Sequence, residues 1–135
     1  MLFHILYFCA IYKSGDLNED FEDRDTNVLA FSTDSEFVHR AWRQDNDDIR
    51  DVPFALVSDN NASLSKKLCI YNEEEGIAER ATFIVDPNGV IQHVSINAGS
   101  VGRNPQEILR ILDALQQDEL CPCNWKPGDE TLKPE

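Results

Sequence analysis

Residues 81–96 read ATFIVDPNGVIQHVSI, and this stretch decides how the chain folds. Two apolar runs flank the tetrapeptide Asp86-Pro87-Asn88-Gly89. Proline presets φ near the value that a turn requires and glycine accepts a positive φ, so the tetrapeptide favours a tight turn. The flanking runs are rich in β-branched residues, which suit strands. The sequence therefore predicts a β-hairpin over residues 81–96.

A helix is predicted directly after this hairpin. Asn104 can cap its N-terminus, Pro105 suits the first helical position, and Glu107 completes the capping pattern. The following apolar residues share one helix face: Ile108, Leu109, Ile111, Leu112 and Leu115. After Gln117 the chain becomes polar and rich in proline, which predicts an extended tail.

Strands and helices alternate upstream of the hairpin. Strands are predicted at residues 28–31 and 53–57, and helices at residues 16–24 and 62–68. A further helix begins at Asp34 or Ser35, with apolar residues at helical spacing: Phe37, Val38, Ala41 and Trp42. This alternation indicates an α/β domain. A strand, a helix, a hairpin and a last helix in that order are typical of the end of a thioredoxin-like fold.

The N-terminal segment from Met1 to Tyr12 is apolar but too short to span a bilayer. No Lys or Arg precedes Lys13 and no small-residue cleavage site follows, so the pattern differs from a signal peptide. We therefore predict a buried strand here, no membrane partner, and a cytoplasmic location.

The composition indicates a soluble globular domain with an acidic surface. Of the 135 residues, 41% are hydrophobic and 27% are charged, and the net charge is −13. A nucleic-acid phosphate backbone requires a cationic surface, so this charge argues against nucleic-acid binding. The acidic residues are spread along the chain, which favours a solvated surface.

The four cysteines, Cys9, Cys69, Cys121 and Cys123, are too few for a scaffold built on disulfides. The Cys121-Pro122-Cys123 sequence differs from the usual zinc spacing and no histidine lies near it. We expect no metal and no cofactor. Redox chemistry at the thiols fits the pattern better.

Several segments, in this order, resemble the peroxiredoxin family in its alkyl-hydroperoxide-reductase-like 2-Cys branch. They are DLN (16–18), VLAFSTDS (28–35), FVHRAW (37–42), EEEGIAER (73–80), FIVD (83–86), VGR (101–103) and CPCNWKPG (121–128). The resemblance implies a thioredoxin-like fold that lacks the usual N-terminal strands. It divides the chain into an atypical segment (1–15), a core (16–118) and a resolving-cysteine tail (119–135).

The resemblance also implies a thiol-dependent peroxidase that reduces hydrogen peroxide or alkyl hydroperoxides. In such enzymes a peroxidatic thiolate attacks the peroxide and becomes a sulfenic acid. A resolving thiol from the partner subunit then forms a disulfide, which a thioredoxin-type or other disulfide reductase reduces. The implied partners are thus a peroxide, a reductase and a second copy of the chain in a homodimer.

Site residues follow from the matching motifs. Arg80 matches the active-site arginine of the family, and a fixed cation lowers a cysteine pKa. Cys121 matches the resolving cysteine, and Arg103 resembles a supporting arginine. His39 and Trp42 lie three residues apart on one helix face, and the family has a similar pair near its active site. From packing alone we expect a half-exposed His39 and a packed Trp42, and the two interpretations are compatible.

The other two cysteines have different expected roles. Cys69 is interpreted as a buried structural thiol, at a position where the family usually has glycine. Cys123 is either a competitor for the disulfide or spare, and we interpret it as spare.

The peroxidatic motif, Pro-x-x-x-Thr-x-x-Cys-Pro in the family, is not intact here. Cys9 is the only N-terminal cysteine, and Leu2, Leu6 and Ala10 stand where the motif has Pro, Thr and Pro. Cys9 is therefore only a weak candidate for the peroxidatic thiol. A local frameshift or gene-model error before Asp16 would explain the break. The alternative function is a non-catalytic interaction protein that dimerises through the edge strand at residues 90–96.

Overall fold

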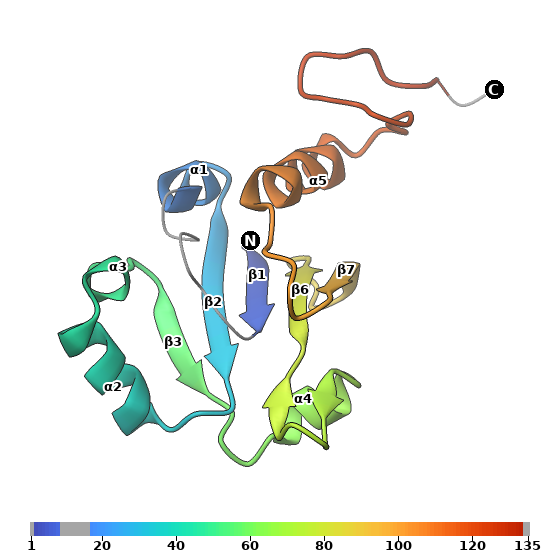
Figure 1. Cartoon of the computed structure of the whole chain (residues 1–135). Helices are drawn as coiled ribbons and strands as arrows, with labels where there is room; N and C mark the ends of the chain where they lie inside the picture. Colours follow the sequence, from blue (N-terminus) through green and yellow to red (C-terminus); the bar gives the residue numbers. More distant parts are fainter. Residues whose placement is uncertain (1, 9–16, 134–135) are drawn as a thin grey trace. The chain divides into compact units, whose positions relative to one another are not determined.

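The computed structural model describes residues 2–8 and 17–133, and its contacts divide the chain into two compact units (Figure 1). Unit 1 comprises Met1–Arg103 and unit 2 comprises Asn104–Glu135. The boundaries predicted after residues 15 and 118 stay predictions.

Unit 1 is built on a five-stranded mixed sheet in the order β3-β2-β1-β6-β7. Its strands are β1 (Phe3–Phe8), β2 (Thr26–Ser32), β3 (Ala55–Ser58), β6 (Arg80–Val85) and β7 (Ile91–Asn97). The first three are mutually parallel, whereas β6 runs antiparallel to β1 and β7 antiparallel to β6. The α/β prediction is confirmed.

The predicted N-terminal strand is confirmed over Phe3–Phe8 and forms the centre of the sheet. Ile5, Tyr7 and Phe8 are fully buried. A strand covered on both faces requires a continuous apolar run, which this segment supplies. Phe8 stacks on Phe31 of β2, with the ring centroids 4.9 Å apart. The remainder of the predicted segment lies outside the described residues.

Short elements connect these strands: α1 (Asn18–Glu22), α2 (Glu36–Asp45), α3 (Asp47–Arg50), α4 (Ser63–Lys67), β4 (Tyr71–Asn72) and β5 (Ile77–Ala78). Figure 1 shows α2 and α3 beside β3. Ser35 caps α2, because its Oγ accepts a hydrogen bond from the Val38 N–H at 3.3 Å. The predicted apolar face of α2 is largely exposed, since Phe37 is 73% exposed.

The predicted hairpin is confirmed as β6 and β7. The Asp86 carboxylate accepts hydrogen bonds from the N–H groups of Val90 and Asn88 and from the Gln92 side chain. These bonds, that from Val90 first, lower the pKa of Asp86. Gly89 takes the positive φ of +81° that the turn requires. β7 is an edge strand and exposes Val94 and Ile96.

Unit 2 consists of α5 (Pro105–Gln117) and the segment that follows it. Asn104 caps the helix as predicted, and Ile108 and Leu112 are buried. The segment after α5 folds back on itself, because the Leu132 N–H donates to the Leu120 carbonyl at 2.7 Å. It is therefore a closed loop, in contrast to the extended tail that the proline content predicted.

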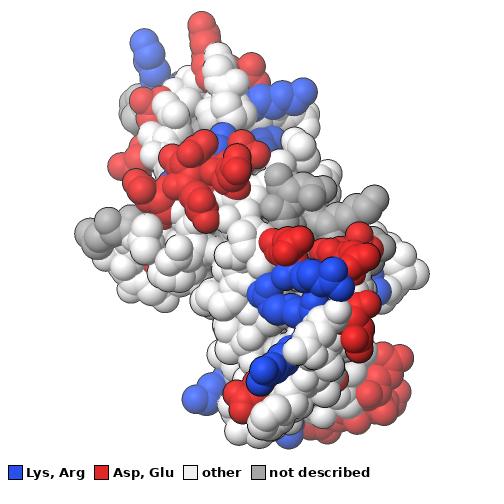
Figure 2. All heavy atoms as spheres, turned by 90° about the vertical axis from the view of Figure 1, so that its left-hand side faces the viewer, with Lys and Arg blue, Asp and Glu red and all other residues white. Residues whose placement is uncertain are grey.

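The surface carries both signs of charge. On the face that Figure 2 shows, red acidic side chains form several separate patches with blue basic side chains between them. This distribution agrees with the strongly negative net charge of the sequence.

Candidate functional site

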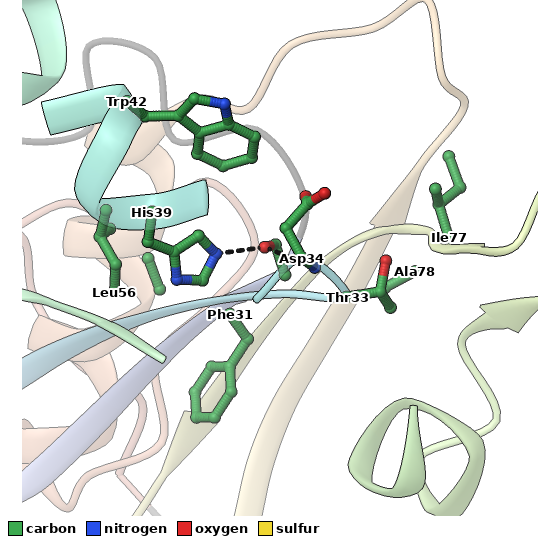
Figure 3. Close-up of a pocket in the computed structure, with 10 residues that line it drawn as sticks. Phe31, Thr33, Asp34, His39, Trp42, Leu56, Ile77 and Ala78 are labelled. Atoms are coloured by element: carbon green, nitrogen blue, oxygen red, sulfur yellow. Dashed lines mark hydrogen bonds between the residues drawn. The ribbon is translucent and has the colours of Figure 1, made fainter. Parts of the chain in front are cut away.

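A cavity of about 240 Å³ opens in unit 1 where the parallel strands β2 and β3 end (Figure 3). The carboxyl ends of parallel strands are where open α/β sheets bind ligands. Most of the lining is apolar, and its residues are Ala30, Phe31, Ser32, Thr33, Asp34, His39, Trp42, Leu56, Ile77 and Ala78. The cavity thus suits a small molecule with an apolar part.

His39 lies on the wall of this cavity and is only 5% exposed. Its Nε2 is hydrogen-bonded to the Ser32 Oγ at 2.5 Å (Figure 3). The Asp34 N–H donates to the same hydroxyl oxygen. Burial lowers the pKa of His39, although the Asp34 carboxylate and the Leu56 carbonyl act in the opposite direction. Burial thus favours the neutral imidazole, whose Nε2 shares a hydrogen bond with the Ser32 hydroxyl.

The expected exposure of His39 and Trp42 is wrong. His39 is buried rather than half-exposed, whereas Trp42 is 38% exposed rather than packed. Their ring centroids are 5.4 Å apart. The hydrogen bond to Ser32 turns the imidazole toward the sheet and leaves Trp42 at the rim. Sequence reasoning missed Ser32, although a polar residue at the end of an apolar strand is a usable signal.

Arg80 begins β6, two residues after Ala78 of the cavity wall. Its side chain is partly exposed and makes no hydrogen bond or ion pair with any residue that the structure describes. Its guanidinium donors are therefore unoccupied within the part of the chain that the structure describes.

Arg103, by contrast, is fixed against the same strand. Its Nε donates to the Thr82 Oγ1 and its Nη2 to the Ala81 carbonyl, both at 3.1 Å. The guanidinium also lies 5.3 Å from the centre of the Tyr7 ring. Burial raises the pKa of Tyr7 to about 12, against the opposing effect of Arg103. The Tyr7 hydroxyl has no hydrogen-bond partner among the described residues.

The sheet brings the two predicted arginines to one region. Arg80 and Thr82 are two positions apart on β6 and so face the same side. Arg103 is bonded to Thr82, and Thr82 pairs with Tyr7 of β1. Cys9, the peroxidatic candidate, lies outside the described residues.

Cys121 belongs to unit 2 and is half-buried. Its Sγ lies 3.6 Å from the Glu119 carbonyl oxygen and 4.0 Å from that of Ala114. Cys123, two residues later, is exposed and is a free thiol. The structure thus distinguishes the two neighbouring cysteines by their burial.

Cys69 is exposed, so the prediction of a buried structural thiol is wrong. It follows α4 with a φ of +58°, and its N–H donates to the Lys66 carbonyl. A left-handed residue commonly terminates a helix in this way, and glycine is the usual choice because it lacks a Cβ. The end of α4 therefore requires a positive φ at Cys69.

The described residues contain neither a cluster of metal ligands nor a helix that could cross a membrane. No group of three or more His, Cys, Asp or Glu side chains among them could hold a metal ion. In the same part of the chain, no helix has the length and apolar character that a membrane crossing needs.

Comparison with known proteins defines the class of this fold. AhpC of Mycobacterium bovis shares 46% identity, with a TM-score of 0.81, over 92% of this chain and 74% of that one. A reduced 2-Cys peroxiredoxin of Plasmodium vivax shares 29% identity, with a TM-score of 0.90, over 99% and 77%. The chain has the thioredoxin-like fold of the peroxiredoxins, as the sequence predicted.

Sequence comparison then gives the family. The profile of the AhpC/TSA family matches residues 10–94, and that of the C-terminal domain of 1-Cys peroxiredoxin matches residues 115–135. Alkyl hydroperoxide reductase C of Mycolicibacterium smegmatis is 58% identical over 87% of this chain. The chain belongs to the AhpC/TSA family. It spans about 60% of the length of the first curated relatives that it matches.

Proposed function

We propose that this chain acts as a thiol-dependent peroxidase that reduces hydrogen peroxide or alkyl hydroperoxides. The observation that carries the proposal is the Arg80 side chain, which has no hydrogen-bond or ion-pair partner among the described residues and belongs to the residue two positions after Ala78 of the cavity wall. A guanidinium stabilises a thiolate and can donate to a peroxide oxygen. The family membership of the chain supports the same chemistry.

Cys9 is the proposed peroxidatic thiol. It follows Phe8, the last residue of β1, and β1 pairs antiparallel with β6, the strand that Arg80 begins. The pairing runs from His4 opposite Val85 to Tyr7 opposite Thr82, so the end of β1 is directed toward the Arg80 end of β6. Arg103 supports the arrangement through Thr82.

The proposed reaction has two steps in the protein. The Cys9 thiolate attacks one peroxide oxygen, the O–O bond breaks, and the leaving oxygen takes a proton to become water or an alcohol. The Cys121 thiol of a second copy then attacks the Cys9 sulfenic acid, so that a disulfide forms and water leaves. A thioredoxin-type or other dithiol reductase supplies two electrons to restore both thiols.

The cavity is the proposed site for the organic group of an alkyl hydroperoxide. Phe31, Leu56 and Ile77 provide apolar walls, and Asp34 provides a polar side chain at the same cavity. Burial of an alkyl group would release water from these walls and favour binding. The proposal predicts a lower KM for hydroperoxides with an apolar tail than for hydrogen peroxide.

We place dimerisation at β7 and the protein in the cytoplasm. The exposed side chains of Val94 and Ile96 lie on a strand that has a free edge. Such an edge can pair with the same strand of a second copy. This exposed strand also favours the alternative function, a non-catalytic interaction protein that dimerises without reducing peroxide.

The deciding experiment measures peroxide consumption with thioredoxin and its reductase as electron source. We expect turnover by the unaltered chain, none by Cys9→Ser, and a strong loss in Arg80→Gln. Arg50→Gln is the control, because Arg50 lies on α3 and pairs with Asp47 on the surface. No turnover from a protein that still dimerises would contradict the peroxidase proposal and favour the alternative.

A further inference from the structure

The segment from Leu120 to Leu132, here called the Cys121 loop, is closed at both ends. Leu132 donates its N–H to the Leu120 carbonyl, and the Thr131 hydroxyl donates to the Glu119 carboxylate just outside the loop. Inside the loop, the Trp125 N–H donates to the Pro122 carbonyl at 3.2 Å. These bonds give the loop a defined shape, with Cys121 beside its closing bridge.

Arg110 of α5 bonds to the middle of this loop. Its Nη1 donates to the Trp125 carbonyl oxygen at 2.8 Å. Its Nε and Nη2 donate to the two carboxylate oxygens of Glu107, both at 2.7 Å. A bidentate pair fixes the plane of the guanidinium, so that Nη1 points in one direction. Trp125 itself is only 3% exposed.

Cys121 lies against the same face of α5. Glu107, Arg110 and Ala114 are spaced so that they share one side of the helix. The Ala114 carbonyl oxygen lies 4.0 Å from the Cys121 Sγ. The hydrogen bonds to Glu107 raise the pKa of Arg110, and the nearby Cys121 acts in the same direction. The guanidinium therefore holds the loop at Trp125, on the helix face that Cys121 contacts.

We propose that Arg110 is a positioning residue for Cys121: its bond to the Trp125 carbonyl keeps the Cys121 loop on α5 and the thiol half-buried. The inference rests on the proposed resolving role of Cys121. Breaking this bond frees the loop from the helix and makes the thiol accessible to a sulfur on another molecule. Arg110 thereby sets how readily Cys121 enters a disulfide.

The test measures how fast Cys121 reacts with Ellman's reagent, DTNB, which needs no peroxide. Cys9, Cys69 and Cys123 are replaced by serine, so that Cys121 is the only thiol. We expect Arg110→Gln to raise the reaction rate about tenfold, because a charge-assisted hydrogen bond that restrains the loop is lost. Arg110→Lys keeps the positive charge and an N–H donor group but loses the planar fork. Its reaction rate should lie between those of the unaltered Arg110 protein and Arg110→Gln.

A second readout follows the loop itself. With Trp42→Phe as background, Trp125 is the only tryptophan. We expect its fluorescence to shift to longer wavelength in Arg110→Gln, as the indole becomes exposed to water. Arg50→Gln is a matched control, because Arg50 also pairs with an acid three residues away, at 2.8 Å, but lies on α3 of unit 1. It should leave both readouts unchanged.

Glu107→Gln provides a variant that keeps Arg110. It weakens the bidentate anchor, so the DTNB rate should rise by less than in Arg110→Gln. Unchanged DTNB rates and Trp125 emission in a folded Arg110→Gln or Glu107→Gln variant would overturn the positioning role. Because neither readout involves peroxide, loss of the peroxidase proposal would leave this result intact, and the reverse also holds.

Discussion

Arg80 of unit 1 and Arg110 of unit 2 differ in whether their donors are occupied. In unit 1, Arg80 begins β6 two residues after Ala78 of the cavity wall, and its side chain has no hydrogen-bond or ion-pair partner among the described residues. In unit 2, Arg110 donates to Glu107 twice and to the Trp125 carbonyl once. A guanidinium with its donors occupied holds structure in place, whereas one with free donors can respond to a substrate. This contrast is the reason why we propose Arg80 for the chemistry and Arg110 for holding the Cys121 loop.

The largest effect is expected from substitution of Arg80. Arg80→Gln should lower kcat/KM for peroxide about a hundredfold, because a preorganised cation at the reacting atoms is lost. Arg80→Lys should recover little, since lysine lacks the planar fork. Steady-state peroxide consumption measures both variants. A loss of less than about twofold in Arg80→Gln would remove the distinction between the two arginines.

The second-largest effect is expected at Asp59, which stabilises the start of α4 in the segment between β3 and β6. Its carboxylate accepts hydrogen bonds from the Leu64 N–H and from the N–H and hydroxyl of Ser65. Burial alone would raise the pKa of Asp59, but these bonds lower it overall. Asp59→Ala should therefore cost about 2 kcal/mol of the free energy of unfolding. Urea denaturation at pH 7 measures the loss.

The pH dependence of Asp59 has a definite sign. Its folded-state pKa lies below its unfolded value, so its contribution is complete above the unfolded pKa, near about 4. The contribution is lost as the pH falls through the folded pKa. Asp59→Ala should consequently differ less from the unaltered chain at pH 3 than at pH 7. An equal difference at both pH values would contradict this origin.

His39 should produce a smaller, pH-dependent effect at the cavity. Burial lowers its pKa, so the folded chain binds its proton less readily than the unfolded chain. Stability should fall as the pH drops below about 6.5, the ordinary histidine pKa. His39→Gln should reduce this dependence, which urea denaturation at pH 5.5 and pH 7.5 measures. If the free energy of unfolding changed with pH as much in His39→Gln as in the unaltered chain, another group would be the cause of the pH dependence.

The smallest effect is expected at Cys69, outside both arginine regions. Its positive φ is unfavourable for a residue with a Cβ. Cys69→Gly should therefore raise the free energy of unfolding by up to about 1 kcal/mol, without a change in peroxide consumption. Thermal denaturation tests the first part, and the peroxide assay tests the second. A fall in stability would contradict the strain argument.

Local chemistry made much of the fold predictable from the sequence. The hairpin follows from Asp86 to Gly89, and the caps at Ser35 and Asn104 follow from side chains that bond within three residues. The central strand follows from an apolar run, although its pairing with β2 and β6 does not. These features depend on residues that are close together in the sequence, so they can be predicted from it.

The errors have the opposite origin. The burial of His39 depends on Ser32, seven residues away. The closed Cys121 loop depends on the bridge between Leu120 and Leu132, and on an Arg110 bond that spans fifteen residues to Trp125. Cys69 has a left-handed backbone conformation, with a φ of +58°, which the apolar residues around it in the sequence do not indicate. Each was decided by a contact or a dihedral angle that residue type alone does not specify.

The most direct test of the central claim is to trap the sulfenic acid. A variant with Cys121 and Cys123 replaced by serine is treated with one equivalent of hydrogen peroxide in the presence of dimedone, and the label is located by peptide mass spectrometry. We predict dimedone on Cys9, with little on Cys69, and a strong loss of the Cys9 label in Arg80→Gln. An unlabelled Cys9, or equal labelling of Cys9 and the exposed Cys69, would contradict the account.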